Sequence, residues 1–305
     1  MDFKKPENKL ALDSEIKKLC HAYSNMLLNL NNTDQHKAAL LFYWLREYKQ
    51  LLNREKGFNP NYLKKYNRGD IINVNLGFNP GSEQGGLHYA IVLSNTPKSS
   101  ETITIIPLKS KKSEDYIPRY GEIDLGSEFI DIFSEKSKSI LLNFDNELEL
   151  YNDLVNQKNN LANDSTTKLE LAKSFYETFK NTLRNSSSEE EFEAIRKTEE
   201  PKLKEKLNEV QQSIKNLEHT NEEIKEKRQF IEETSNLAKA HMAHLNTLNS
   251  GSIALVNQIT TISKMRIINP IRSKDTLSKI KLSPQTLDLI DKEILKLFTY
   301  QKSKN

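Results

Sequence analysis

The side chains best suited to chemistry lie around the end of a glycine-punctuated loop. Glu83, Gln84 and His88 bring a carboxylate, an amide and an imidazole together there. Histidine is the side chain best suited to proton transfer near neutral pH, because its ordinary pKa lies close to that value. Later in the chain, Lys109 and Ser110 offer a fixed positive charge and a hydroxyl donor. This combination is typical of a working loop and not of a plain turn.

The segments on either side of this loop are expected to be strands. Residues 70–76 alternate apolar and polar types, as a half-buried strand does, and residues 90–93 form an unbroken apolar run. The polar stretch between them contains Pro80, Gly81, Gly85 and Gly86. Residues 67–133 as a whole have the character of short strands and loops, so the loop is expected to join two neighbouring strands.

Four blocks in this order resemble the MazF/PemK family of toxin endoribonucleases from bacterial toxin–antitoxin pairs. They are Gly69-Asp70-Ile71, the intact Gly81-Ser82-Glu83-Gln84-Gly85-Gly86 loop, the run Thr102–Ser110 with Pro107-Leu108, and the run Gly251–Ile262 with Gln258. A C-terminal helix within Leu282–Phe298 also matches, so the resemblance covers about residues 67–133 and 251–298. It implies an α+β fold, with a small antiparallel β-barrel of the SH3-like type and a C-terminal helix.

The sequence departs from the family at its two catalytic positions. The family's catalytic Arg falls on His88, with Tyr89 in place of the usual Pro, and its catalytic Thr falls on Lys109, beside Ser110. Cleaving RNA without a metal needs a base for the 2′-hydroxyl proton, an acid for the leaving 5′-oxygen and positive charge near the phosphoryl oxygens. His88 with Lys109 or Ser110 is chemically adequate, and Glu83 is either an acid–base group or a pin for the loop. The resemblance thus implies a metal-independent endoribonuclease that cleaves single-stranded RNA. The alternative is an inactive module that binds RNA or a protein.

Several residues near these positions are candidates for binding RNA. Gln84 either reads a base edge or stabilises the loop, and Gln258 either faces the substrate or bonds to neighbouring backbone. The basic cluster beginning at Lys109 either binds phosphates, with tyrosines for base stacking, or is a solvated loop. The complete RNA-binding set is Gln84, Tyr89, Lys111, Lys112, Arg119 and Gln258.

Composition restricts the other possibilities. The 305-residue chain has 45 basic and 42 acidic residues, and its net charge of +3 gives no overall attraction for nucleic acid or membrane. Cys20 is the only cysteine, which fits a reducing cytoplasm. We see no signal peptide, membrane-spanning run, or motif for a metal or cofactor. His241 and His244 are expected to be solvated helix residues. The family resemblance adds a protein antitoxin and a homodimer as expected partners.

Helical periodicity dominates the remaining segments. Two helices are expected within residues 12–56, and the first has Ile16, Leu19 and Tyr23 on one apolar face. The pair is expected to pack as a helical hairpin on the barrel or on a second subunit. Heptad spacing from Leu141 to Leu183 and from Leu203 to Ile231 predicts a long antiparallel coiled coil inserted into the barrel. Its seam would include Leu148, Leu169, Tyr176, Leu207 and Ile214, and Pro201 would mark a helix start or a kink. The expected divisions are 1–66 (N-terminal helices), 67–137 (barrel), 138–249 (coiled coil) and 250–305 (barrel and C-terminal helix).

Overall fold

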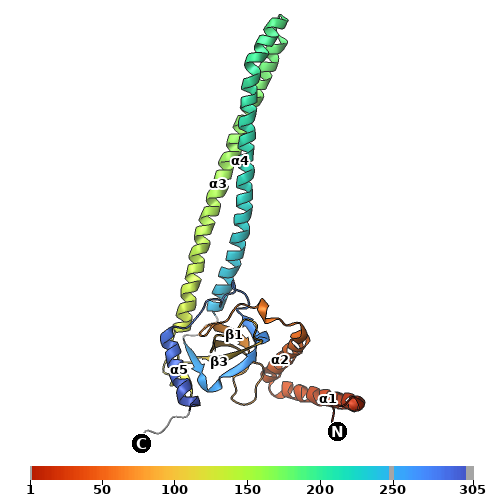
Figure 1. Ribbon diagram of the computed structural model, residues 1–305, viewed down its shortest axis with the longest axis vertical. Helices are drawn as coiled ribbons and strands as arrows, with labels where there is room; N and C mark the ends of the chain where they lie inside the picture. Colours follow the sequence, from red (N-terminus) through yellow and green to blue (C-terminus); the bar gives the residue numbers. More distant parts are fainter. Residues whose placement is uncertain (1, 247–250, 300–305) are drawn as a thin grey trace. The chain divides into compact units, whose positions relative to one another are not determined.

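Seven short strands form one antiparallel sheet in the computed structural model, which describes residues 2–246 and 251–299 (Figure 1). The strand order is β4-β5-β3-β2-β1-β7, and β6 also pairs with β3. The two outermost strands, β4 and β7, are not paired with each other in the described residues, so closure into a barrel stays a prediction. The strands are β1 Ile71–Asn75, β2 Leu87–Val92, β3 Thr102–Ser110, β4 Glu122–Asp124, β5 Ser252–Leu255, β6 Thr260–Ser263 and β7 Ile267–Asn269.

The sheet is covered by apolar side chains on both faces, because successive residues of a strand point to opposite sides. In β2, Ile91 belongs to one buried cluster while Ala90 and Val92 belong to the other. The first cluster is closed by helix α5, Pro284–Phe298, through Ile290, and by Phe129 at the beginning of a long helix. The predicted C-terminal helix is therefore present, and it packs on the sheet.

Two helices precede the sheet: α1, Lys9–Thr33, and α2, Gln35–Arg54. Asp34 separates them, and its carboxylate caps α2 by accepting a hydrogen bond of 3.0 Å from the backbone N–H of Lys37. The prediction of two helices here is correct. None of the 25 residues of α1 is buried in this chain by itself, so the surface on which the helical hairpin packs stays a prediction.

A second compact unit, Glu135–His244, consists of the greater part of two long helices. They are α3, Glu128–Arg184, and α4, Glu189–Leu245, each 57 residues long, or roughly 85 Å at 1.5 Å per residue. The predicted break between them is correct: Ser188 Oγ accepts a hydrogen bond from Glu191 N, and the Glu191 carboxylate accepts one from Ser187 N. Pro201 lies inside α4 and does not mark its start.

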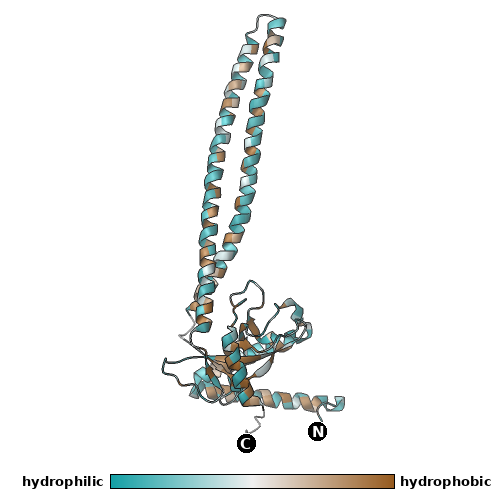
Figure 2. Ribbon diagram, turned by 60° about the vertical axis from the view of Figure 1, so that its left-hand side comes forward, coloured by the Kyte–Doolittle hydropathy of each residue, from teal (hydrophilic) through white to brown (hydrophobic). Residues whose placement is uncertain are grey.

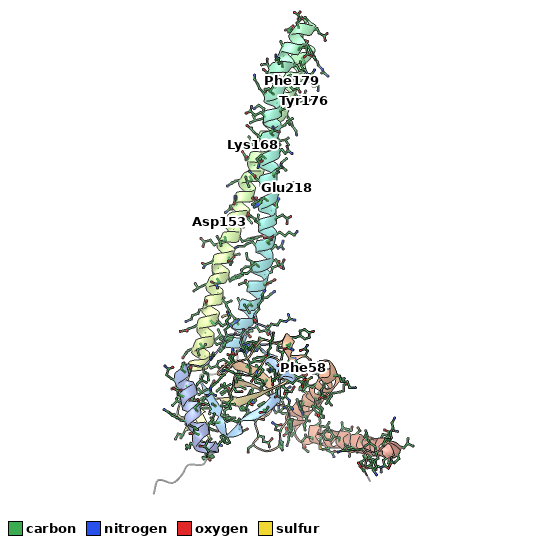
Figure 3. The ribbon with its side chains drawn as sticks, viewed as in Figure 1. Phe58, Asp153, Lys168, Tyr176, Phe179 and Glu218 are labelled. Atoms are coloured by element: carbon green, nitrogen blue, oxygen red, sulfur yellow. The ribbon has the colours of Figure 1, made fainter. Side chains whose placement is uncertain are left out.

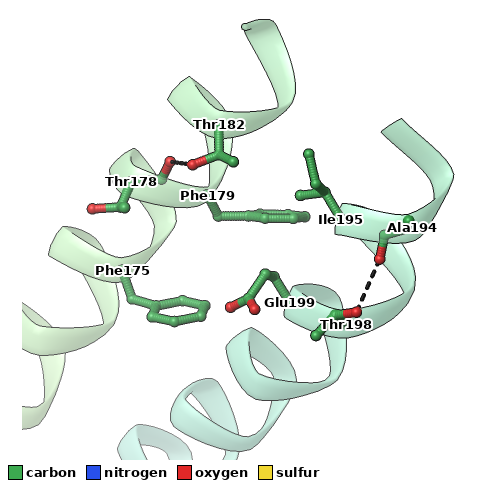
Figure 4. A pocket seen from close by; sticks show the side chains of 8 residues that line it. All are labelled: Phe175, Thr178, Phe179, Thr182, Ala194, Ile195, Thr198 and Glu199. Carbon is green, nitrogen blue, oxygen red and sulfur yellow. Dashed lines mark hydrogen bonds between the residues drawn. The ribbon is translucent and has the colours of Figure 1, made fainter. Parts of the chain in front are cut away.

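Helices α3 and α4 run antiparallel, because early residues of α3 meet late residues of α4 (Figures 1 and 2). Ser137 lies 3.0 Å from His241, and Ser165 Oγ lies 2.7 Å from Ser213 Oγ. Towards the far end, Phe175 and Phe179 face α4 across a pocket of about 520 Å³ (Figure 4). Figure 3 shows where Phe179 and its neighbour Tyr176 lie along α3.

The expected seam of this pair is only partly correct. Leu148, Leu169 and Tyr176 of α3, and Leu207 and Ile214 of α4, are between 38% and 50% exposed. The buried residues of α4 are Val210, which the expected seam includes, and Ser213, Thr220, Ala238 and His241, which it does not; their spacing fits one heptad repeat. Compared with the expected seam, alternate buried positions of α4 lie one residue earlier in the sequence. Three of the five buried residues are polar. The expectation of a solvated His241 is therefore wrong.

None of the described helices is both long enough and apolar enough to span a membrane. The first compact unit comprises residues 1–134 and 245–305. The expected division between residues 249 and 250 falls outside the described residues, as does the helix stop predicted there.

Candidate active site

The glycine-rich loop between β1 and β2 is closed by backbone hydrogen bonds at its base. Gly86 N donates to Gly77 O over 2.6 Å, and Leu76 N donates to Gly86 O over 2.8 Å. Gly77 and Gly86 both have φ of +83°, a backbone conformation that side chains with a Cβ rarely adopt. Glycine at these two positions therefore lets the loop turn back onto the sheet.

Gln258 fixes the middle of this loop. Its Oε1 accepts a hydrogen bond of 2.7 Å from Gln84 N, and its Nε2 donates to Ser82 O over 3.3 Å. Gln258 ends η4, Val256–Gln258, a single turn that follows β5. Of its two predicted roles, bonding to neighbouring backbone is the one seen here. Glu83 is exposed, and within the described part of the chain its carboxylate accepts no hydrogen bond.

His88 lies near the start of β2, half-buried, with its ring held on two sides. Its Nδ1 lies 3.2 Å from Leu108 O on the adjacent strand β3. The side-chain nitrogen of Gln84 lies 3.0 Å from Nδ1 and 2.5 Å from Nε2. Burial lowers the pKa of His88, and this outweighs the hydrogen bonds to the Leu108 and Gly85 carbonyls, which act to raise it. The imidazole is therefore neutral at pH 7.

Lys109 is ion-paired. Its Nζ donates to Glu122 Oε1 over 2.5 Å and to the Tyr116 hydroxyl over 2.7 Å, and that hydroxyl donates to Glu122 Oε2 over 2.7 Å. Arg119 N donates to the same Glu122 oxygen over 2.9 Å. Burial acts to lower the pKa of Lys109, but Glu122 and Tyr116 raise it overall. Lys109 is thus a permanent cation whose charge is balanced by Glu122.

Seven of the ten predicted site residues line two hollows, and Lys111, Lys112 and Arg119 line neither. His88, Tyr89, Lys109 and Ser110 line a pocket of about 160 Å³. A groove of about 680 Å³ takes in three others, Glu83, Gln84 and Gln258. The contact between Gln84 and His88 connects the two hollows.

The segment that contains the loop, His88 and Lys109 is similar to a known protein family. Residues 67–198 match the model of the PemK-like, MazF-like toxins of type II toxin–antitoxin systems. This region, less than half of the chain, is thus similar to the PemK-like, MazF-like toxin family. No curated protein matches the chain. The PemK-like match includes strands β1 to β4 and the loop. Strands β5 and β6 lie beyond it in sequence, yet both pair with β3 in the same sheet.

The other basic candidates of the PemK-like region differ in their surroundings. Lys111 Nζ donates to Asp124 Oδ2 over 2.6 Å, while Lys112 and Arg119 are exposed. Burial acts to raise the pKa of Asp124, but Lys111 and the N–H of Gly126 lower it overall. Of the predicted stacking residues, Tyr89 packs against Phe129 with ring centres 4.9 Å apart, so its ring belongs to the core.

Sequence reasoning did not find two parts of this site. Glu122 lies on β4, and no local pattern indicates that its carboxylate meets Lys109. Arg266 ends η5, Lys264–Arg266, and lines the same groove as Gln84. Among the described residues, no group of three or more His, Cys, Asp or Glu side chains is arranged to hold a metal.

Proposed function

We propose that this protein is a toxin endoribonuclease that cleaves single-stranded RNA without a metal, with His88 as its base. The observation that carries the proposal is the neutral, half-buried imidazole of His88 beside the intact loop, within the region that matches the toxin family. A neutral imidazole is ready to accept a proton at pH 7, whereas a protonated one is not.

The reaction needs only two proton transfers. The Leu108 carbonyl accepts a hydrogen bond, so Nδ1 carries the proton and Nε2 is the basic nitrogen. Nε2 takes the 2′-hydroxyl proton as the 2′-oxygen attacks the adjacent phosphorus. The bond from phosphorus to the 5′-oxygen breaks, and the imidazolium returns its proton to that oxygen, leaving a 2′,3′-cyclic phosphate. The Gln84 amide lies against Nε2, so the substrate hydroxyl has to displace it.

The remaining site residues have supporting roles in this proposal. Lys109 and Tyr116 form a polarised pair that stabilises charge on the phosphoryl oxygens, with Ser110 as a further hydroxyl donor beside the same pocket. Gln84, Lys111, Lys112 and Arg119 contact the RNA backbone or bases around the pocket. Glu83 lines the groove, where it serves as an acid–base group or holds the loop in place.

A specific observation favours a second function, an inactive module that binds RNA or a protein. Glu122 cancels the charge of Lys109, and the family's catalytic pair is absent. The cation that should face the phosphate is thus partly neutralised, which weakens the electrostatic part of catalysis. In that case the chain would bind RNA and not cut it at any pH.

Cleavage by purified protein in EDTA separates the two functions. We expect native protein to cut single-stranded RNA, and His88→Ala to abolish cutting. His219→Ala is the matched control, because His219 is an exposed histidine of α4. The rate should be flat near pH 7 and fall as His88 becomes protonated below pH 6.5. Equal cutting by His88→Ala protein would contradict the proposed role.

We also propose the finer points of assembly. The sheet closes into a small barrel that forms a homodimer in the cytoplasm, and a protein antitoxin neutralises it. The buried residues of α4 are spaced 3, 7, 18 and 3 apart, which fits the a and d positions of one heptad repeat and supports a coiled coil of α3 and α4. Light scattering of the full chain tests the homodimer, and a monomer at micromolar concentration would contradict it.

A further inference from the structure

The groove that contains Gln84 has one cation with hydrogen-bonding capacity to spare. Its amide side chains already donate to backbone: Asn79 Nδ2 to Gln84 O, Asn257 Nδ2 to Tyr120 O, and Gln258 Nε2 to Ser82 O. Arg266 also lines the groove, and a guanidinium has five N–H donors. One of its nitrogens, Nη1, donates to Leu76 O over 3.3 Å.

The charge of Arg266 is not balanced by a carboxylate. No ion pair joins it to any residue in the described parts of the chain, whereas Lys109 and Lys111 are paired with Glu122 and Asp124. Lys109 and Lys111 are thus neutralised, whereas the Arg266 guanidinium has no ion-pair partner among the described residues. The groove lining also contains one carboxylate, that of Glu83. A guanidinium is also well matched to phosphate, because its planar fork can donate two parallel hydrogen bonds.

Helix α2 holds this guanidinium in place. The Arg266 guanidinium carbon lies 5.2 Å from the centre of the Trp44 ring, a cation–π contact. The same ring lies against the base of the loop, where a Cβ on Gly77 would come within 2.8 Å of it. Trp44 therefore touches both Arg266 and the loop that bears Gln84.

We propose that this groove binds a phosphate of single-stranded RNA through Arg266, with Trp44 as the residue that positions the guanidinium. The inference rests on the proposed function in taking RNA as the ligand. Gln84 lines the groove and contacts His88, so a strand lying in the groove leads directly to the catalytic pocket. Glu83 is the one carboxylate among the lining residues, and it opposes a phosphate there.

The test measures binding apart from cleavage. Fluorescein-labelled single-stranded RNA is titrated, in EDTA and at several salt concentrations, with full-length protein carrying His88→Ala so that the RNA stays intact. Arg266→Ala should weaken binding at least tenfold at low salt and reduce the slope of log affinity against log salt by about 0.7, the value for one phosphate on a single strand. Arg266→Lys should keep the slope while losing affinity. Trp44→Leu should weaken binding by a smaller factor.

Arg272→Ala is the matched control, because Arg272 is an exposed arginine that lies outside the groove. It should change the affinity less than twofold. Equal binding and equal slope for Arg266→Ala and Arg272→Ala would overturn the inference, as would a native chain that binds no RNA. Circular dichroism checks that each variant is folded, and Arg266→Lys preserves the charge should Arg266→Ala unfold. If RNA binding depends on Arg266 but the native chain never cuts RNA, the proposed nuclease activity is wrong and the proposed phosphate site is still supported.

Discussion

Replacing Glu122 by Gln removes the charge that balances Lys109 and should have two opposite effects. The carboxylate accepts three hydrogen bonds, from Lys109 Nζ, the Tyr116 hydroxyl and Arg119 N. Glutamine keeps one acceptor oxygen and replaces the other with a donor. The folded chain should therefore lose stability, while the freed Lys109 ammonium should attract RNA more strongly.

The loss of stability follows from burial. The Glu122 side chain is 8% exposed and that of Lys109 27%, so the pair lies between the buried and surface limits. Breaking a buried pair costs about 3–5 kcal/mol, and an exposed pair contributes about 0–1 kcal/mol. We expect Glu122→Gln to reduce the free energy of unfolding by about 2 kcal/mol. For a unit of this size that is a fall in Tm of about 4–8 °C.

Urea denaturation followed by tryptophan fluorescence suits this measurement, because Trp44 is the only tryptophan and reports on the unit that contains the sheet. In a double-mutant cycle with Lys109→Met, the coupling should be about 1–2 kcal/mol. The lowered pKa of Glu122 means that its contribution is present above the ordinary carboxyl range and is lost as pH falls through the folded value. The deficit should thus shrink as the pH falls below the ordinary carboxyl range. A zero coupling, together with unchanged RNA affinity, would refute this account of Lys109.

Two further measurements test other parts of the structure. Gly77→Ala should destabilise the sheet by about 1 kcal/mol more than Gly81→Ala, because both have positive φ but only Gly77 would place its Cβ against Trp44; equal urea midpoints would contradict the contact. Burial lowers the pKa of His241 to about 4, so stability should fall by about 2 kcal/mol between pH 7 and pH 5 as the unfolded histidine takes up a proton. Thermal melts followed by circular dichroism should show that His241→Asn removes this loss, and an unchanged pH dependence in the variant would count against it.

The sequence predicted those parts of the fold that depend on local patterns. The alternation at residues 70–76 and the apolar run at 90–93 are now β1 and β2, and Asp34 caps α2 as a helix start requires. The surface against which the apolar face of α1 packs could not be predicted in this way. Periodicity shows that a helix has an apolar face, but whether another surface covers that face depends on tertiary contacts.

The seam of α3 and α4 shows a second limit. Selecting apolar residues at spacings of three and four placed Leu207 and Ile214 in the seam. The chain instead buries Ser213 and His241, which are hydrogen-bonded to Ser165 and Ser137 across the pair. A polar residue that is buried with a partner looks like a surface residue in a hydropathy pattern. Half of the heptad positions therefore could not be recognised from the sequence.

The candidate site was predictable as a set of residues but not as a distribution of charge. The loop and His88 follow from one contiguous stretch, whereas the partners of Lys109 lie on a strand whose position depends on the whole sheet. The sequence suggested a basic cluster beginning at Lys109 as the phosphate contact. Two lysines of this cluster, Lys109 and Lys111, form ion pairs with Glu122 and Asp124.

Two separate sources of positive charge follow from this arrangement. A paired Lys109 can stabilise charge that develops on a phosphoryl oxygen during the reaction, because Glu122 holds the ammonium in one position. It adds little long-range attraction, since the pair is neutral beyond its immediate surroundings. Arg266 is unpaired, so it attracts the strand before any chemistry begins. Removing Arg266 should therefore act mainly on RNA affinity, and removing Lys109 mainly on the rate of cleavage of RNA that is already bound.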